Sequence, residues 1–415
     1  MNDREQRGLE IAAVTKIKKA NSVWLVPSQT GSSTYQVSMD TSTPQCSCPD
    51  FGMRGQKCKH IYAVEFTIKR ETKPDGTTTV TKTMRVTYKQ DWPTYNAAQT
   101  HETEHFVKLL RELCDGIPQP AQTFGRPRLP LSDVVFGMAY KVYSTMSGRR
   151  IMSELREAES KGLLSKTPSF TSGFRYLENP ELTPLLKVLI EQSAMPMKAI
   201  ESDFAVDSSG FSTTTYDRWF DHKYGKMRSE AKWIKAHLMC GVKTHVVTSV
   251  EVTPTETADA PQFGPLVNTT AKTFAINEVS ADKAYSSRRN LHAVQAVGGT
   301  AYIPFKSYSI GVPKHTNKYD SLWHHTWAYY QYNRQTFLAH YHKRSNVETT
   351  YSMIKAKFGG AVRAKTPVAQ VNEVLVKILC HNICTLITSI FELGIEAQTG
   401  VLTFGTELPV VPEVG

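Results

Sequence analysis

The chain has 415 residues, 40% of them hydrophobic, and a formal net charge of +11 with a pI of about 9.1. This length suits two or three domains, but no stretch approaches the roughly 20 continuous apolar residues of a membrane span, and the opening residues, MNDREQRGLE, are too polar for a signal peptide. We therefore expect a cytoplasmic, nucleoid-associated protein whose charge favours nucleic acid over a membrane as its partner.

Two strands joined by a turn are the first predicted elements. VWLVPS (23–28) and TYQVSM (34–39) have the composition of strands, and Gly31 lies in the turn between them. They lead into CSCPDFGMRGQKCKH (46–60), which holds three of the seven cysteines of the chain. This density of soft ligands indicates a metal site.

The pattern within this stretch is C-x-C-x9-C-x-H. Its four candidate ligands are Cys46, Cys48, Cys58 and His60. Three thiolates and one imidazole complete a tetrahedral zinc shell without water, which is typical of a structural site. The alternative is a chance cluster of free thiols, but Pro49 and Gly52 supply turn chemistry, and Lys57 and Lys59 would offset thiolate charge.

The other four cysteines stand in apolar or helical contexts. We interpret them as small buried hydrophobes of a protein in a reducing compartment. They are Cys114, Cys240, Cys380 and Cys384.

A hairpin is followed by CxC and then by CxH, and HIYAVEF at the end of the motif begins a helix or strand. This order resembles the SWIM zinc finger over residues 20–68. The resemblance implies binding to DNA or to protein without deciding between them. A second hairpin is predicted over 69–89, where Asp75-Gly76 separates alternating Thr and Val positions. Residues 1–95 therefore form a small, β-rich zinc-binding domain in this interpretation.

A helix and a linker are predicted next, over residues 96–130. Apolar residues recur at helical spacing up to Leu113, and a Pro-rich segment follows over 116–130. Within it, Arg126 and Arg128 belong to Gly-Arg-Pro-Arg, whose extended basic form suits an A·T-rich minor groove. A solvated linker with two exposed arginines is the alternative.

Residues 131–200 are predicted to be helical. Ser132 or Asp133 is expected to cap the first helix, and Gly148 to interrupt the pattern. Short helices with nearby cations predict either a helix-turn-helix that binds DNA or a plain helical spacer. The cations are Arg149, Arg150, Lys161 and Lys166.

Two aspartates follow predicted strands in the next segment. Strand 204–206 ends at Asp207, with a turn expected over 208–210, and strand 274–279 is followed by Asp282. Between them, WIKAHLMCGV and THVVTSVEVTPTE predict an antiparallel meander, and a helix is expected to begin near Ser286. Taken alone, an aspartate in either position is more often a turn residue or a helix cap than a catalytic residue.

A basic helix is predicted over residues 341–360. It places one carboxylate among a phenol and two cations on a single face, namely Tyr341, Arg344, Glu348 and Lys355. From residue 341 to 365 there are six Lys or Arg and one acid, a net +5. These basic residues would bind phosphates, so the single glutamate among them is expected to bind a metal cation. The alternative is that Glu348 only forms an ion pair with Arg344, four residues earlier on the helix.

VDSSGF, SADKAYSS and the Y-x2-R-x3-E-x6-K string resemble DDE transposases of insertion sequences with the Tyr-Arg-Glu-Lys signature, over residues 125–392. The resemblance implies an α/β, RNase H-like mixed five-stranded sheet with flanking helices over 201–395, with YIPF (302–305) as a possible fifth strand. Residues 396–415 would be a C-terminal tail. The family's first aspartate lies on the first strand, the second after the fourth, and the glutamate on a following helix.

The resemblance also implies the chemistry. Asp207, Asp282 and Glu348 would hold two Mg²⁺ or Mn²⁺ ions that cleave element ends and transfer the strand to target DNA. Tyr341, Arg344 and Lys355 would grip phosphates of double-stranded DNA carrying the terminal inverted repeats, and a homodimer is expected on that DNA.

Trp219 lies in a basic, aromatic run after the first aspartate, so it is expected either to stack on a displaced base or to pack in the core. Two other functions stay open. One is a domesticated zinc-finger regulator that binds DNA without cutting it. The other is a metal-dependent nuclease without strand transfer.

Overall fold

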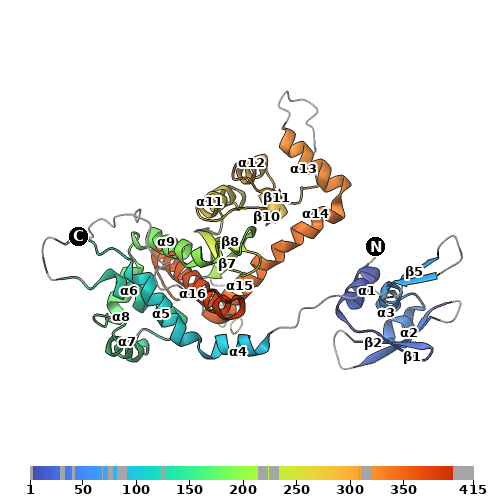
Figure 1. Cartoon of the computed structure of the whole chain (residues 1–415), viewed down its shortest axis with the longest axis horizontal. Helices are drawn as coiled ribbons and strands as arrows, with labels where there is room; N and C mark the ends of the chain where they lie inside the picture. Colours follow the sequence, from blue (N-terminus) through green and yellow to red (C-terminus); the bar gives the residue numbers. More distant parts are fainter. Residues whose placement is uncertain are drawn as a thin grey trace. The chain divides into compact units, whose positions relative to one another are not determined.

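The computed structural model divides into two compact units, residues 1–90 and 91–415, which are described separately (Figure 1). The structure describes residues 3–28, 33–39, 43–67, 69–72, 78–81, 91–122, 125, 127–213, 223, 233–307, 309 and 320–395.

The described residues of the first unit include an antiparallel sheet in the order β1-β2-β3-β4, together with the helices α1, α2 and α3. Its elements are α1 (Asp3–Val14), β1 (Lys18–Ala20), β2 (Val23–Pro27), β3 (Thr34–Ser38), β4 (Gln45–Cys46), α2 (Pro49–Arg54) and α3 (Lys59–Thr67). Strands β2 and β3 confirm the first predicted hairpin, whose turn lies outside the described residues. Ile11 of α1 and Ile61 of α3 are buried with Val26 and Val37 of the sheet in one small core.

The second predicted hairpin is present as an antiparallel pair. Strand β5 (Lys69–Thr72) pairs with β6 (Thr78–Thr81), with Lys69 opposite Thr81. The Asp75-Gly76 turn lies outside the described residues. These strands belong to the first unit.

The second unit begins with helices, as predicted. They are α4 (Trp92–Thr100), α5 (Glu102–Asp115), α6 (Leu131–Tyr143), α7 (Ile151–Ser160), α8 (Phe170–Leu177), α9 (Leu182–Ala194) and the 3₁₀ turn η1 (Met195–Met197). The helix predicted from residue 96 is two helices, because the chain bends at His101, which ends α4 and precedes α5.

The predicted cap of α6 is wrong. The residue before the helix is Pro130, which makes no side-chain cap hydrogen bond, and both Ser132 and Asp133 lie inside the first turn. The Asp133 carboxylate is buried and accepts a hydrogen bond from the Ser165 backbone N–H at 3.1 Å. It also pairs with Arg111 at 3.0 Å. A buried tertiary ion pair therefore replaces the local cap.

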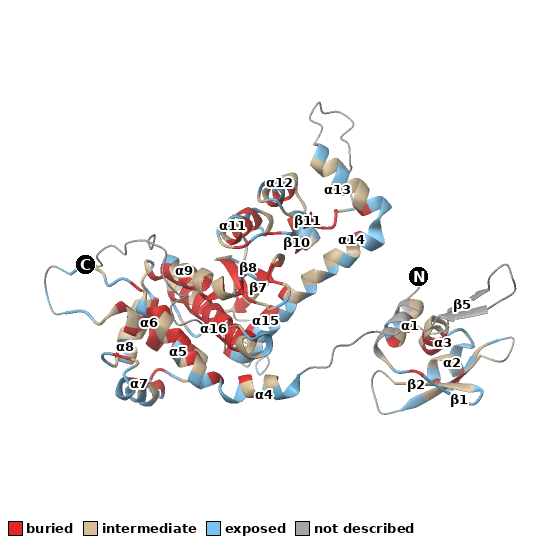
Figure 2. Ribbon diagram, in the orientation of Figure 1, coloured by how far each residue is buried: buried red, intermediate tan, exposed pale blue. Residues whose placement is uncertain are grey.

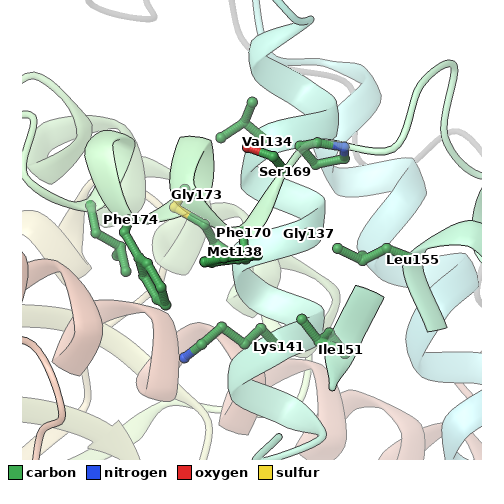
Figure 3. Close-up of a pocket in the computed structure, with 12 residues that line it drawn as sticks. Val134, Gly137, Met138, Lys141, Ile151, Leu155, Ser169, Phe170, Gly173 and Phe174 are labelled. Atoms are coloured by element: carbon green, nitrogen blue, oxygen red, sulfur yellow. The ribbon is translucent and has the colours of Figure 1, made fainter. Parts of the chain in front are cut away.

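Helix α6 is at the centre of this helical layer. A pocket of about 20 Å³ lies between α6 and α8, lined by Gly137, Met138, Phe170 and Phe174 (Figure 3). The Lys141 ammonium lies 5.7 Å from the Phe174 ring, and burial lowers its pKa. The pocket has room for about one water molecule, so it is a packing defect and not a ligand site.

A five-stranded mixed sheet forms the core of the second unit, in the order β11-β10-β7-β8-β9. Strands β7, β8 and β9 are an antiparallel meander, whereas β10 is parallel to both β7 and β11. Their bounds are β7 (Asp203–Ser212), β8 (Trp233–Gly241), β9 (Val247–Pro254), β10 (Glu278–Ala281) and β11 (Thr300–Tyr302). This is the predicted RNase H-like sheet.

Three predicted strand limits are wrong. Strand β7 does not end at Asp207 but continues through residues 208–210, because they pair in register with β8. Strand β10 begins at Glu278 and not at residue 274. The fifth strand is Thr300–Tyr302, two residues earlier than predicted, where it pairs with β10.

Helices cover both faces of this sheet (Figures 1 and 2). Helices α11 and α12 pack on one face, and α15, α16 and α9 pack on the other. The bounds are α11 (Ala260–Ala271), the 3₁₀ turn η2 (Lys283–Tyr285), α12 (Arg288–Ala296), α13 (Ser321–Tyr332), α14 (Arg334–Tyr341), the 3₁₀ turn η3 (His342–Arg344), α15 (Ser345–Phe358) and α16 (Pro367–Leu393). The layers join in one apolar core.

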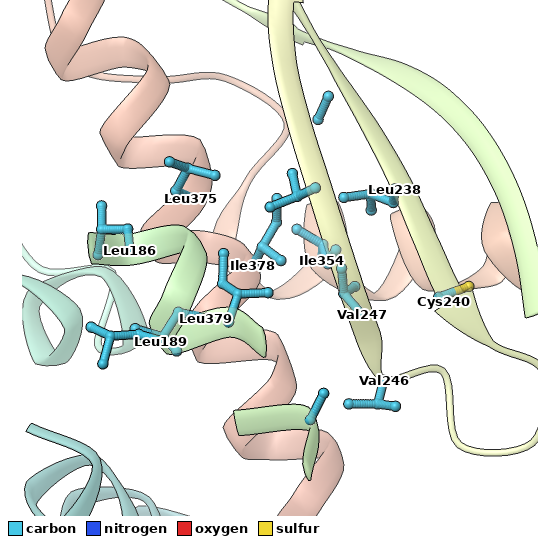
Figure 4. Close-up of a cluster of buried hydrophobic side chains, with 14 of the residues drawn as sticks. Leu186, Leu189, Leu238, Cys240, Val246, Val247, Ile354, Leu375, Ile378 and Leu379 are labelled. Carbon is cyan, nitrogen blue, oxygen red and sulfur yellow. The ribbon is translucent and has the colours of Figure 1, made fainter. Parts of the chain in front are cut away.

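Helix α16 corrects the expectation that no segment is apolar enough to span a membrane. By length and composition it could do so, but 83% of its most apolar window is buried inside the structure. Figure 4 shows its Leu375, Ile378 and Leu379 packed with Leu189 of α9 and Val247 of β9. Helix α16 thus serves as the common core of the helical layer and the sheet.

Candidate active site and zinc centre

The four predicted zinc ligands meet in the first unit. Cys46 ends β4, Cys48 precedes α2, and Cys58 and His60 lie at the start of α3. All four are buried, and their ligand atoms lie within 4.8 Å of one another. The Nδ1 atom of His60 lies 3.9 Å from the Sγ atoms of both Cys46 and Cys58.

These distances fit zinc. Zn–S bonds of about 2.3 Å and Zn–N bonds of about 2.0 Å in a tetrahedron place sulfur and nitrogen about 3.5 Å apart. The thiols cannot all ionise without a cation: a hydrogen bond from Cys46 lowers the pKa of Cys58 to about 3, whereas the pKa of Cys46 is raised. The burial of three thiols beside an imidazole is therefore explained by a bound Zn²⁺.

In the second unit, strand register brings the two predicted aspartates together. The last paired residues of β10 and β7 are Ala281 and Val206, so Asp282 and Asp207 come next on neighbouring strands. The backbone at Asp282 is still extended, with φ −67° and ψ 159°, so both side chains keep the same face of the sheet. Asp282 also accepts the Lys283 N–H at 2.6 Å, so it caps η2 as well.

Arg344 links the third predicted carboxylate, that of Glu348, to Asp207. Arg344 donates to Asp207 at 2.6 Å and also to Glu348, one turn into α15. The side chains of Arg344 and Asp207 are only about one fifth exposed, whereas that of Glu348 is 56% exposed. One guanidinium therefore bridges a carboxylate of the sheet and a carboxylate of the helix.

The electrostatics at Asp207 show that the three acids interact. Burial raises the pKa of Asp207, and the carboxylates of Asp282 and Glu348 raise it further. The Ser208 N–H, 2.8 Å away, and Arg344 lower it without cancelling the rise. Three acids gathered around a partly buried position require positive charge, which Arg344 supplies here and a divalent cation could supply instead.

The four-residue string predicted on one continuous helix lies on three elements. Tyr341 ends α14, Arg344 ends η3, and Glu348 and Lys355 lie on α15. The continuous helix is therefore wrong in its first turn. A 3₁₀ turn tightens the chain at residues 342–344, and Lys343 within it is held by two acids of the sheet.

Lys355 lies on the same side of β7 as Asp207. Its ammonium donates to Ser209 Oγ at 2.7 Å and lies 5.3 Å from the Phe211 ring. Burial lowers its pKa. The pKa of Tyr341 is raised, first by burial and also by Asp282 and Asp207, which places its phenol near the same acids.

Sequence reasoning missed Tyr351, which fixes α15 to the sheet. Its hydroxyl donates to the carbonyl oxygens of Asp207 at 3.1 Å and of Ala236 at 2.5 Å, and the side chain is buried. It lies three residues after Glu348, so the spacing in the predicted helix could have marked it as facing the same strand.

The remaining predicted contacts are only partly described. Arg126 and Trp219 lie outside the described residues. The Arg128 backbone N–H donates to the Gln122 side-chain oxygen at 3.0 Å.

The four other cysteines are buried, as predicted, and stand apart from the zinc cluster. Cys240 accepts a hydrogen bond from Thr350, and Cys380 donates to the Ala139 carbonyl at 3.3 Å. Burial raises the pKa of Cys240 and of Cys114 to about 12. They therefore act as core residues and not as metal ligands or nucleophiles.

Two family models match parts of the chain. Residues 198–383 match the transposase DDE domain, and residues 35–69 match the SWIM zinc finger. A solved structure described as the cryo-EM structure of piggyBac transposase synaptic complex with hairpin DNA is 12% identical, with a TM-score of 0.35, and covers 75% of this chain and 78% of that chain. No curated protein matches the chain. The chain therefore carries a transposase DDE domain preceded by a SWIM zinc finger.

Proposed function

We propose that the chain is a DNA transposase that cleaves the ends of its element and joins them to target DNA. The observation that carries the proposal is that Asp207 of β7 and Asp282, which directly follows β10, are neighbours in the strand register, with Glu348 on α15, which packs against β7 and β8. Nothing local in the sequence brings these residues together. A transposase DDE domain match over the same residues supports this interpretation.

The donor set fits hard divalent cations, because all three residues offer carboxylate oxygens and thiolates are absent from the described part of the site. Asp207 would hold two ions, and Asp282 and Glu348 would each hold one. When bound there, two Mg²⁺ or Mn²⁺ ions would supply an activated water and would stabilise charge on the leaving oxygen.

The proposed reaction has two displacements at phosphorus. In the first, the water oxygen attacks the phosphate at the element end, and the bond to the 3′ oxygen breaks to leave a free 3′-OH. In the second, this 3′-OH attacks a phosphate of target DNA and releases a target 3′-OH. Neither displacement forms a bond between protein and DNA.

The residues around the acids would hold the DNA backbone. Arg344 already neutralises carboxylate charge, and a phosphate would compete for its guanidinium, since planar bidentate recognition suits both partners. Tyr341 and Lys355 flank the same acids and would contact neighbouring phosphates. Tyr341, Arg344, Glu348 and Lys355 are the residues that would place the protein in the group with the Tyr-Arg-Glu-Lys signature. The zinc finger and a second copy of the chain would complete the complex on the terminal repeats.

The test uses the DNA that flanks the gene. Short inverted repeats bordered by a direct duplication would identify the substrate, and the purified full chain should cut these ends in Mg²⁺ or Mn²⁺ to give free 3′-OH groups and then joined products. Cleavage without joining would instead identify a nuclease. Binding without cleavage would identify a domesticated regulator.

A further inference from the structure

The 3₁₀ turn η3 is held to the sheet by a second set of charges beside the candidate active site. The ammonium of Lys343 lies 2.7 Å from Asp203 and 2.7 Å from Glu278. These acids are the first residues of β7 and β10, and they stand directly opposite each other in the strand register. One lysine thus joins the turn to two strands.

The two acids need this cation. Like charges opposite each other on neighbouring strands repel, and the side chains of Asp203 and Glu278 are only 18% and 14% exposed. Although burial opposes it, hydrogen bonds from Lys343 and Asn277 lower the pKa of Asp203. The lowered pKa keeps Asp203 charged beside Lys343, and the ammonium of Lys343 contacts both carboxylates at 2.7 Å.

Strand β11 is also linked to this group of charges, through His340 of α14, the helix before η3. The His340 Nδ1 atom lies 2.9 Å from the Glu278 carboxylate. Its ring stacks on Tyr302 of β11, with centroids 4.4 Å apart and planes 8° apart. The end of α14 and the turn η3 are thus fixed to β7, β10 and β11 together.

The same arrangement recurs four residues further along both strands. Asp207 lies four positions after Asp203, Asp282 lies four positions after Glu278, and Arg344 follows Lys343. Four residues of strand span about 13 Å. Lys343 and Arg344, which are adjacent, therefore reach to acids at two levels of the sheet and hold η3 between them.

We propose that Lys343, Asp203, Glu278 and His340 form a clamp that positions Arg344 and Glu348 against the two strands that carry Asp207 and Asp282. This inference rests on the proposed function of those acids. None of the four clamp residues is one of the proposed metal ligands, so they are positioning residues. Their effect would fall mainly on the geometry of the reacting groups, with only a small effect on DNA affinity through Arg344.

The test compares Lys343→Met with Lys343→Arg. Loss of the ammonium should free η3, so amide hydrogen exchange over residues 340–349 should accelerate while exchange in α16 stays unchanged. At saturating DNA, the single-turnover cleavage rate should fall about 100-fold, the typical effect of a misplacement near 1 Å. DNA affinity should change little, and Lys343→Arg should restore most of the rate because it keeps the charge.

Lys187→Met is the matched control. Lys187 pairs with Glu251 at 2.6 Å, with similar exposure, and joins α9 to β9 instead of the turn to β7. It should leave the cleavage rate and the exchange of residues 340–349 unchanged. If Lys343→Met unfolds the protein, Glu278→Gln, which keeps the side-chain size, takes its place.

Three outcomes would overturn the clamp. The first is unaltered hydrogen exchange over residues 340–349 in Lys343→Met, and the second is an equal loss of cleavage rate in Lys187→Met. The third is a loss of DNA affinity in Lys343→Met with an unchanged cleavage rate, which would make Lys343 a phosphate contact. Exchange is measured without DNA. If the wild-type chain cuts no DNA, the proposed function fails, yet exchange still decides whether the clamp exists.

Discussion

The guanidinium of Arg344 lies 2.6 Å from the carboxylate of Asp207, a residue 137 positions earlier in the chain. The same guanidinium also holds Glu348 in the next turn of helix. Because Asp207 is on β7 and Glu348 is on α15, this contact joins two of the elements that position the three proposed catalytic acids. It also shows that Arg344 does pair with Glu348, and that it has a second, more buried partner.

Replacement of Arg344 by Gln separates its two proposed roles. If Arg344 grips a phosphate, the variant should bind element-end DNA more weakly, and the logarithm of affinity should fall less steeply with the logarithm of salt, by about one unit of slope. Fluorescence anisotropy across a salt series measures both quantities. Arg334→Gln is the control, because that guanidinium lies over the Tyr330 ring instead of beside a carboxylate. An unchanged slope would leave Arg344 with its carboxylate pairs alone.

Replacement of any one acid by its amide tests the proposed metal site. Asp207→Asn, Asp282→Asn and Glu348→Gln keep the size of the side chain but remove the charge that holds a cation. The rates of cleavage and joining should therefore fall together by several orders of magnitude. DNA binding should persist, because it depends on basic side chains and not on the three acids. Gel assays of both products check this. Full joining activity in any of these variants would remove that residue from the site.

Calcium offers a test without mutation. Its coordination is looser and more variable than the octahedral shell of Mg²⁺. Ca²⁺ should therefore support DNA binding by the wild-type chain but neither cleavage nor joining. Equal product yields in Ca²⁺ and Mg²⁺ would contradict a site built for strict in-line geometry.

Much of this architecture could be predicted because local patterns dictate it. The spacing of Cys46, Cys48, Cys58 and His60 defines a ligand set in the sequence itself, and the structure confirms that they meet. The order of strands and helices around Asp207 is likewise visible in the hydrophobic pattern. The resemblance to DDE transposases then supplied the topology that pattern alone leaves open.

The errors arise where tertiary partners override local signals. Residues 208–210 look like a turn, yet they remain in β7 because β8 supplies strand partners. Aspartate commonly caps helices, but Asp133 is instead buried in an ion pair with Arg111. The break at residues 342–344 could not be predicted, since it depends on Lys343 reaching acids 140 and 65 positions away.

The zinc site can be tested separately from the catalysis. Cys58→Ser should lose the metal and unfold mainly residues 20–68, because the core formed by the described residues of this unit is small and includes three of the proposed zinc ligands. Metal analysis and hydrogen exchange measure the two effects. Cys114→Ser, in the core of the other unit, should keep its zinc. Full zinc content in Cys58→Ser would remove that residue from the ligand set.

Lys377 provides a pH-dependent measure of the stability of the second unit. Its ammonium is buried on α16 and donates to the carbonyl oxygens of Gly359 at 3.0 Å and Ala361 at 2.6 Å, just beyond α15. Burial lowers its pKa from the ordinary 10.5 to about 8, against the opposing effect of Glu373. The folded protein therefore binds this proton less tightly than the unfolded chain.

The direction of the effect follows from this difference. Below about pH 8 both states carry the proton and the full cost of the buried charge is present, whereas above about 10.5 both are neutral and the cost is gone. One pKa unit corresponds to about 1.4 kcal/mol, so the free energy of unfolding of the wild type, relative to Lys377→Met, should rise by about 3 kcal/mol between these limits. Urea unfolding at a series of pH values measures it. A difference that is constant, or that falls with rising pH, would show that Lys377 keeps its ordinary pKa in the folded protein.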